Sequence, residues 1–289
     1  MNKNPVLGIA LGGGGARGFA HIGVLKALER QGIFPRLVAG TSMGGVVGAM
    51  YAVGLSAEQM EDEAIKATSR VGDMLRSVDV TLSQTGLVRG ARIYDYIAGV
   101  IGLETKFSDL RRPLSLVSVD LNTGREVVLN SGRVADAVRA TISVPGVFQP
   151  VEMGKLRLVD GGMLNNVPVD VVRQMGADVV IAVDVLPSFV QNTPGQPPVV
   201  EPLQPKRALR VYRDLWHVVM IMISAATEAR LYECPPDILL RPALASDIDV
   251  LIGFNRQREA IAAGEAAAEA AMDQILAAVG REPASSVDN

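Results

Sequence analysis

The stretch that decides the fold is Gly40-Thr41-Ser42-Met43-Gly44, a Gly-x-Ser-x-Gly sequence. It lies where an apolar run, residues 37–39, gives way to a helical pattern at residues 46–51. A strand that turns sharply into a helix presents one side chain at the apex, and glycines on either side let the backbones pass closely. Here that side chain is Ser42. A turn of small residues is the alternative, because Gly and Ser are common in turns, so the rest of the chain has to decide.

A glycine loop precedes this turn. Residues 6–11 are apolar and predict a strand, and the run Gly12-Gly13-Gly14-Gly15-Ala16-Arg17-Gly18 follows. Apolar residues at helical spacing, at positions 22, 25, 27 and 28, then predict a helix. Bare backbone N–H groups at the start of a helix, together with the positive end of the helix dipole, bind anions. We therefore expect this loop to hold negative charge.

A dinucleotide is one candidate for that anion, because Gly13-x-Gly15-x-x-Gly18 matches the dinucleotide-binding pattern. That pattern requires an acidic residue roughly 20 positions further on, and residues 33–40 contain none. The Gly-Lys-Ser/Thr of phosphate-binding loops is also missing. The sequence thus favours an oxyanion over a nucleotide, and a non-catalytic anion-binding or nucleotide-binding module remains the alternative function.

The turns after neighbouring parallel strands open at the same edge of a sheet, so the glycine loop and Ser42 are expected to share one cleft. Acyl transfer through a serine creates an alkoxide that needs preorganised N–H donors. The candidate oxyanion-hole residues are Gly13, Gly14, Gly15 and Arg17. Arg17 would either add positive charge or tie the loop to a carbonyl group, and we favour the second, supporting role.

The candidate base is Asp160, which follows a predicted strand at residues 156–159 and precedes Gly161 and Gly162. An aspartate at the end of a strand is expected at the same carboxyl edge as the serine, and the glycines behind it permit close approach. A simple Asp-Gly turn is the alternative. Asp160 thus offers a carboxylate partner for the serine.

Two histidines, His21 and His217, compete for the role of base. The order Ser42, Asp160, His217 even matches the order of an α/β-hydrolase triad. However, His217 lies inside a predicted helix, the serine comes too early for that fold, and that fold does not explain the glycine loop. His21 lies one turn into the first helix and faces its apolar stripe, where a buried histidine is commonest. We therefore favour a dyad without histidine.

Composition argues against some classes of function and indicates where the protein is located. The chain has 289 residues, 48% of them hydrophobic, and a formal charge of −3, with no cluster of basic residues that would bind nucleic acid. Residues 218–226, the longest strongly apolar run, are about half the length that crosses a bilayer. The single cysteine, Cys234, cannot form an internal disulfide, and no signal peptide is evident, so we predict a cytoplasmic protein.

One domain is expected over residues 5–280, with the motifs within residues 6–184, a Pro-rich loop at 186–206, a helical part at 208–279 and a flexible tail at 281–289. Residues 72–90 are less regular, as expected of a lid or a surface excursion rather than a core strand. A helix is expected to be capped near Asn166, and residues 254–278 are expected to form one long helix. A helix over residues 208–231 carries apolar residues that could pack on the sheet or touch lipid, and packing is favoured.

Four motifs together resemble the patatin-like phospholipase family, in the same order. They are the glycine loop with Arg17, the Gly-x-Ser-x-Gly turn, Ser143-Val144-Pro145 with Phe148, and Asp160-Gly161-Gly162 before Asn166-Val167-Pro168. The resemblance runs over about residues 6–184, and residues 253–271 resemble the end of its bacterial members. It implies a three-layer α/β/α fold with a mostly parallel central sheet.

The same resemblance implies the roles of individual residues. Ser42 would be the nucleophile, Asp160 the base, and the backbone N–H groups of Gly13 to Gly15 the oxyanion hole, with supporting glycines at Gly18, Gly40, Gly44, Gly161 and Gly162. The implied activity is hydrolysis of lipid esters, as a phospholipase A, a lysophospholipase or a general carboxylesterase. No cofactor or metal is implied, and peripheral membrane contact is compatible with it. An acyltransferase would use the same dyad and stays open.

Overall fold

The computed structural model describes residues 5–76, 90–186, 207–249 and 253–281 of the chain. The Pro-rich loop and the C-terminal tail expected from the sequence therefore lie outside the described residues, apart from Leu186 and Arg281. Most of the irregular stretch expected at residues 72–90 also lies outside them. Its first part is regular, because helix α3 (Ala57–Arg76) continues through residues 72–76.

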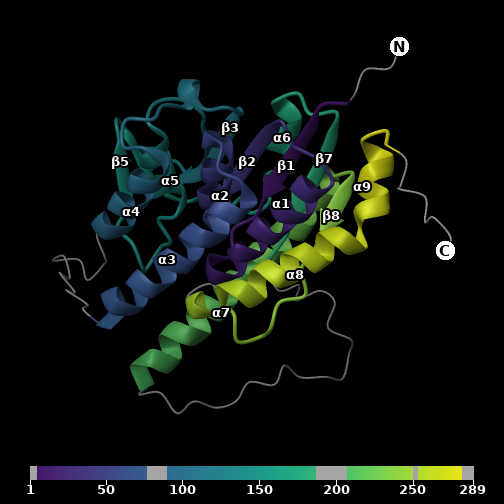
Figure 1. Cartoon of the computed structure of the whole chain (residues 1–289). Coiled ribbons are helices and arrows are strands. Elements are labelled where there is room, and N and C mark those ends of the chain that lie inside the picture. Colours follow the sequence, from purple (N-terminus) through teal and green to yellow (C-terminus); the bar gives the residue numbers. More distant parts are fainter. Residues whose placement is uncertain (1–4, 77–89, 187–206, 250–252, 282–289) are drawn as a thin grey trace.

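A single sheet forms the centre of the fold (Figure 1). Its hydrogen-bonded path runs β5-β6-β3-β2-β1-β7-β8, and β4 also pairs with β3. Strands β3, β2, β1, β7 and β8 pair in parallel, whereas β4 and β6 run antiparallel to β3. The strands are β1 (Leu7–Leu11), β2 (Leu37–Thr41), β3 (Leu114–Asp120), β4 (Arg125–Leu129), β5 (Val151–Met153), β6 (Leu156–Asp160), β7 (Val179–Val183) and β8 (Ile238–Leu240).

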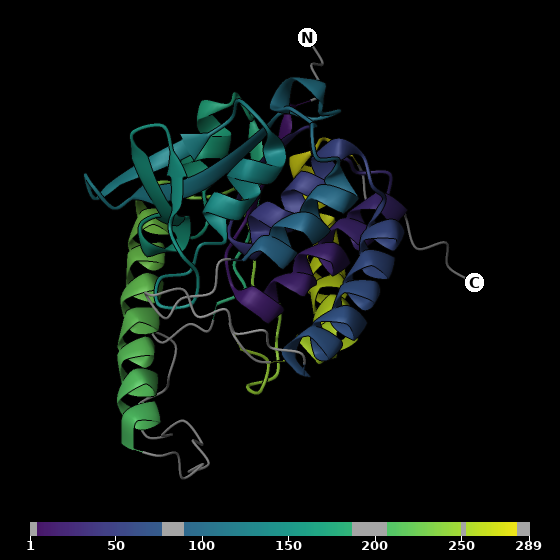
Figure 2. The same ribbon diagram turned by 90° about the vertical axis from the view of Figure 1, so that its left-hand side faces the viewer.

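Helices cover both faces of the sheet, which confirms the predicted three-layer α/β/α fold (Figures 1 and 2). The larger layer packs on Leu7, Ile9 and Leu11 of β1, and the thinner one packs on small residues such as Ala10 and Ala182. The helices are α1 (Ala20–Arg30), α2 (Met43–Val53), α3, α4 (Ala91–Ile101), α5 (Val134–Thr141), α6 (Val169–Gln174), α7 (Arg207–Glu233), α8 (Gln257–Ala270) and α9 (Met272–Ala278). Across the described ranges, no helix combines the length and apolarity that crossing a bilayer requires.

Two helix predictions were wrong. The long helix expected at residues 254–278 is a short 3₁₀ turn followed by α8 and α9, because Ala271 (φ −100°, ψ 5°) leaves the helical region. Helix α6 begins at Val169, with Pro168 rather than Asn166 at its N-cap. The Asn166 side chain instead donates a hydrogen bond to the carbonyl of Gly13, so it ties two loops together and does not cap a helix.

Helices α1 and α8 cross with their backbones in contact. A Cβ atom at Gly23 would overlap the carbonyl of Ile261, and one at Gly264 would overlap the carbonyl of Ala20. Glycine is therefore required on both sides of this crossing. The contact joins the C-terminal helical part to the helix that follows the glycine loop.

Strands β2 and β6 meet end to end along one edge of β3. The other edge is occupied by β4, which pairs with residues 116–120, so β2 and β6 share the remaining edge. Thr41 at the end of β2 pairs with Val117, and Asp160 at the end of β6 pairs with the next residue, Ser118. The carboxyl ends of the two strands therefore lie side by side, and Ser42 follows directly.

Candidate active site

Ser42 occupies a sharp turn between β2 and α2. It is the one non-glycine residue with a positive φ in the described part of the chain (φ 53°, ψ −124°). A side chain held in this region costs about 1–3 kcal/mol, so the surrounding contacts must hold it there. A Cβ atom at Gly44 would overlap the carbonyl of Leu11, so glycine lets α2 start directly against the end of β1, and Gly40 likewise lies against the backbone of Gly44.

Thr141 anchors the backbone of this turn. The N–H of Ser42 donates to Oγ1 of Thr141 (3.0 Å), and the Thr141 hydroxyl donates to the carbonyl of Val117. Thr141 is the last residue of α5 and is fully buried. The threonine hydroxyl therefore bridges the serine turn and β3 at the point where β2 ends.

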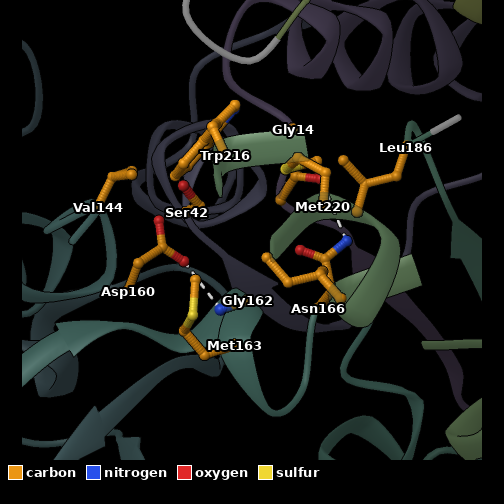
Figure 3. Close-up of a pocket in the computed structure, with 12 residues that line it drawn as sticks. Gly14, Ser42, Val144, Asp160, Gly162, Met163, Asn166, Leu186, Trp216 and Met220 are labelled. Carbon is orange, nitrogen blue, oxygen red and sulfur yellow. Dashed lines mark hydrogen bonds between the residues drawn. The ribbon is translucent and has the colours of Figure 1, made fainter. Parts of the chain in front are cut away.

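Asp160 faces Ser42 across a small cavity, and Figure 3 shows its carboxylate directed toward the serine hydroxyl. Burial raises the pKa of Asp160 to about 6, against the opposing effects of hydrogen bonds from the Ser42 side chain and the Gly162 N–H. The Gly162 N–H lies 2.8 Å from Oδ1. A carboxylate with this pKa accepts a proton far more readily than an ordinary aspartate.

The glycine loop reaches the same cavity through Gly13 and Gly14. The N–H of Gly13 donates to the carbonyl of Asn166 (3.2 Å), and the Asn166 side chain donates back to the carbonyl of Gly13 (3.2 Å). Within the described residues, the N–H groups of Gly14 and Gly15 have no protein acceptor. Of the three glycines predicted to hold an oxyanion, Gly13 has its donor engaged, and Gly14 and Gly15 have theirs available.

Arg17 supports this loop from behind. Its buried guanidinium donates through Nε to the carbonyl of Val185 and through Nη1 to the carbonyl of Ile248 (2.8 Å). Burial lowers the pKa of Arg17, and the charges of Asp249 and Asp184 oppose that shift. Arg17 does not line the cavity, so its position matches the supporting role that the sequence favours.

The two histidines lie away from the cavity lining. His21 is fully buried, its Nε2–H donates to the carbonyl of Gly12 (2.7 Å), and burial lowers its pKa to about 4. It is therefore neutral near pH 7 and holds the first residue of the glycine loop. His217 is exposed on α7. Neither position resembles that of a base bonded to the serine.

The cavity itself is small, with a volume of about 30 Å³, and mostly apolar. Its lining comprises Gly13, Gly14, Ser42, Val144, Asp160, Gly162, Met163, Asn166, Leu186, Trp216, Met220 and Ile223. The remaining predicted site residues, Gly15, Arg17, Gly18, Gly40, Gly44 and Gly161, lie outside this lining. Gly18 and Gly161 instead permit close packing, because a Cβ atom there would overlap the Met43 side chain or the Val117 carbonyl.

Some neighbours of the site were not assigned to it from the sequence. Thr141 and Asn166 contact the serine turn and the glycine loop through hydrogen bonds between residues 99 and 153 positions apart. Asn166 belongs to a motif quoted from the sequence, but its contact with the glycine loop does not follow from any local pattern. Trp216, Met220 and Ile223 of α7 form an apolar wall. In the described part of the chain, no group of three His, Cys, Asp or Glu residues is arranged to bind a metal ion.

Comparison with known proteins identifies the family. Residues 9–173 match the family model described as patatin-like phospholipase. An uncharacterized NTE family protein of Mycobacterium tuberculosis is 35% identical over 92% of this chain and 46% of its own length. A lysophospholipase nte1 of Aspergillus fumigatus is 36% identical over 65% of this chain and 12% of its own length. The chain thus spans about half, or less, of the relatives it matches.

The fold also resembles that of a solved structure. VipD from Legionella pneumophila superimposes with a TM-score of 0.50 over 94% of this chain and 67% of that chain, at 14% sequence identity. At this identity the likeness concerns the fold alone, and it agrees with the three-layer architecture. Because the family model covers more than half of the residues, from β1 to α6, the chain belongs to the patatin-like phospholipase family.

Proposed function

We propose that this protein is a serine acyl-ester hydrolase that cleaves lipid esters through a Ser42–Asp160 dyad and an acyl-serine intermediate. The observation that carries the proposal is the juxtaposition of the Ser42 hydroxyl and the Asp160 carboxylate in an apolar cavity beside the glycine loop. A nucleophile, a base and available N–H donors are the parts that acyl transfer requires.

In the first half-reaction, Asp160 accepts the hydroxyl proton of Ser42 while Oγ attacks the ester carbonyl carbon. The tetrahedral intermediate collapses when the bond to the alcohol oxygen breaks, and Asp160 returns its proton to that oxygen. The products of this half are the free alcohol, such as a lysolipid or glycerol derivative, and the acyl-serine. A pKa near 6 suits Asp160 to both directions of this proton transfer.

In the second half-reaction, Asp160 takes a proton from water as the water oxygen attacks the acyl-serine carbonyl. Collapse of this second intermediate breaks the bond to Oγ, releases the fatty acid, and returns the proton from Asp160 to Ser42. The same cycle with another alcohol in place of water would be an acyl transfer. Both halves generate an oxyanion at the same position.

The oxyanion donors in this proposal are the N–H groups of Gly14 and Gly15. Gly13 has its N–H bonded to Asn166, so its contribution is to fix the loop. Arg17, within the loop, donates to carbonyl groups outside it, and His21 donates to the carbonyl of Gly12. Both side chains therefore hold the loop in place. Preorganised donors of this kind act without reorganising when charge develops.

Lipid esters are the favoured substrate class, because the walls of the cavity include Val144, Met163, Leu186, Trp216 and Met220. Apolar walls suit an acyl chain and leave few hydrogen bonds for a polar acyl group. The proposal agrees with the activity named for the related lysophospholipase. It leaves the head group open.

Covalent labelling with a fluorophosphonate probe tests this function. The probe should label the wild-type protein at one serine, which mass spectrometry of the digest should identify as Ser42. Ser42→Ala should remove the labelling and lower hydrolysis of a short p-nitrophenyl ester by about 10⁴-fold or more, and Asp160→Asn should lower hydrolysis by about 10³–10⁴-fold. Undiminished ester hydrolysis by Ser42→Ala would contradict the assignment, and the absence of any labelling in the wild type would favour a binding module.

A further inference from the structure

Helix α7 has apolar side chains on two opposite faces. Trp216, Met220 and Ile223 face inward and line the cavity that contains Ser42. On the other side, Leu215, Val218 and Met222 have exposed fractions of 62%, 51% and 65%. We call these last three residues the outer face of α7. A helix on the surface of a domain normally presents polar side chains to water, so this outer face calls for an apolar partner.

The sequence of α7 also separates charge from apolarity along the helix. Arginines occupy positions 207, 210 and 213 in its first two turns. Residues 215–226 then contain no Asp, Glu, Lys or Arg. Basic residues beside an apolar stretch that includes a tryptophan are typical of helices that lie on anionic lipid surfaces. The formal charge of the whole chain is negative, −3, so this basic start is a local feature of α7.

The two ends of α7 are held differently. Near the C-terminal end, Arg230 forms ion pairs with Glu126 and Asp170, and Leu231 packs in the core under the sheet. Nearer the start, Met220 and Ile223 pack with Leu186 in a small apolar cluster, against which Trp216 and Val219 also pack. Figure 2 shows the first turns of α7 extending beyond the rest of the domain. Along the sequence, the apolar outer face follows directly after these first turns.

We propose that the outer face of α7 docks this protein onto an anionic lipid surface, with the opposite face of the same helix walling the acyl site. The proposal rests on the proposed function, because a lipid surface is where a lipid hydrolase meets its substrate. It commits to one partner, a bilayer carrying negatively charged head groups. Charge complementarity with the three arginines and continuity with the apolar wall of the cavity support this partner over a second protein.

Docking at α7 also bears on the small volume of the cavity that contains Ser42. The cavity of about 30 Å³ accommodates little more than a water molecule, whereas ligand pockets span roughly 300–1,000 Å³. Trp216 and Met220 are part of the lining that bounds this small space. Because these side chains share a helix with the outer face, lipid contact at α7 acts directly on the wall that must move.

Vesicle flotation tests the docking surface without catalysis. The Ser42→Ala protein would be mixed with vesicles of phosphatidylcholine alone or of phosphatidylcholine with phosphatidylglycerol. We expect binding to the anionic vesicles that falls at high salt. The combined change Leu215→Ser, Val218→Ser and Met222→Ser should weaken this binding by about tenfold or more. Phe34→Ser is the matched control, because Phe34 is 51% exposed in the loop before β2, at the other end of the sheet strands, and its change should leave binding unaltered.

A second variant tests the charge: Arg207→Gln with Arg210→Gln and Arg213→Gln should abolish the preference for anionic vesicles. With Ser42 intact, both sets of variants should still hydrolyse a water-soluble ester, because the outer-face side chains do not line the cavity.

Unchanged vesicle binding by the outer-face variant would overturn the proposal. So would a wild-type dimer that this variant converts to a monomer, because the face would then bind a second copy. Vesicle binding by a wild-type protein without ester hydrolysis would instead refute the proposed function and leave the docking surface standing.

Discussion

Thr41 and Asp160 pair with adjacent residues on one edge of β3. This register places Ser42, the residue after Thr41, beside the carboxylate of Asp160, and the whole arrangement belongs to the sheet rather than to long loops. Side chains held by strands keep their geometry more exactly than side chains on loops. The register explains how the two side chains of the proposed dyad can keep their spacing.

The pH dependence of hydrolysis should follow the ionisation of the Asp160 carboxyl group. A base must be ionised to accept a proton, so kcat/KM should rise with pH and reach half its maximum near the pKa of about 6. Initial rates on a soluble ester between pH 4 and 9 would check this. A half-maximum near pH 4 would show that an ordinary, solvated carboxylate is the base.

Asp160→Asn should stabilise the fold at neutral pH while it removes activity. The folded state holds a proton on Asp160 up to about pH 6, whereas the unfolded state releases it near 3.8, so the Asp160 contribution to stability is lost as pH rises through this window. The variant should exceed the wild type by about 1–3 kcal/mol in free energy of unfolding at pH 7.5, and the two should differ little at pH 4.

Denaturant titrations at both pH values would measure this difference. His21 titrates in both proteins and cancels in the comparison, because its lowered pKa, about 4, is the same in each. Equal destabilisation of Asp160→Asn at both pH values would show that burial of the charge is not the dominant effect.

Thr141→Val should slow the chemical step. Valine keeps the shape of threonine but leaves the buried N–H of Ser42 without its acceptor, at a cost of about 1–3 kcal/mol. We expect a lower kcat with little change in KM and slower fluorophosphonate labelling of Ser42. Thr141→Ser retains the hydroxyl and should restore the labelling rate. If valine lowers stability and leaves that rate unaltered, Thr141 supports the fold and does not position the serine.

Replacing either histidine should leave the chemistry largely intact. In His21→Gln the side-chain amide can still donate to the carbonyl of Gly12, and His217 lies outside the cavity lining. Both variants should keep kcat/KM within about tenfold of the wild type, a change of less than about 1.4 kcal/mol. Loss of activity in His217→Gln alone, with normal folding by circular dichroism, would bring back a catalytic triad.

The parts of the site that depend on consecutive residues were predictable from the sequence. The strand, glycine loop and helix around Gly13 appear as expected, as does the sharp turn at Ser42. Each follows from local backbone chemistry: glycines at a helix start and a turn of small residues.

The parts of the site that depend on tertiary structure were not predictable from the sequence. Asp160 was expected beside Ser42 because parallel strands end at one edge, yet β6 is antiparallel to β3 and runs back to meet β2. Thr141 and Asn166 act through hydrogen bonds across more than 90 residues. The helix containing Trp216 was expected, with packing favoured over lipid contact, but nothing in its periodicity indicates that it walls the serine cavity.

The hydrogen bond from Arg17 to the carbonyl of Ile248 spans 231 positions, and the crossing at Gly23 and Gly264 joins the same two regions. The glycine loop is thus held by a part of the chain that lies beyond residues 9–173, the range that matches the family model. Any cut or local unfolding that frees the C-terminal helices should loosen the donors at Gly14 and Gly15 as well. The reactivity of a single serine would then serve as a gauge of whether the far end of the domain is folded.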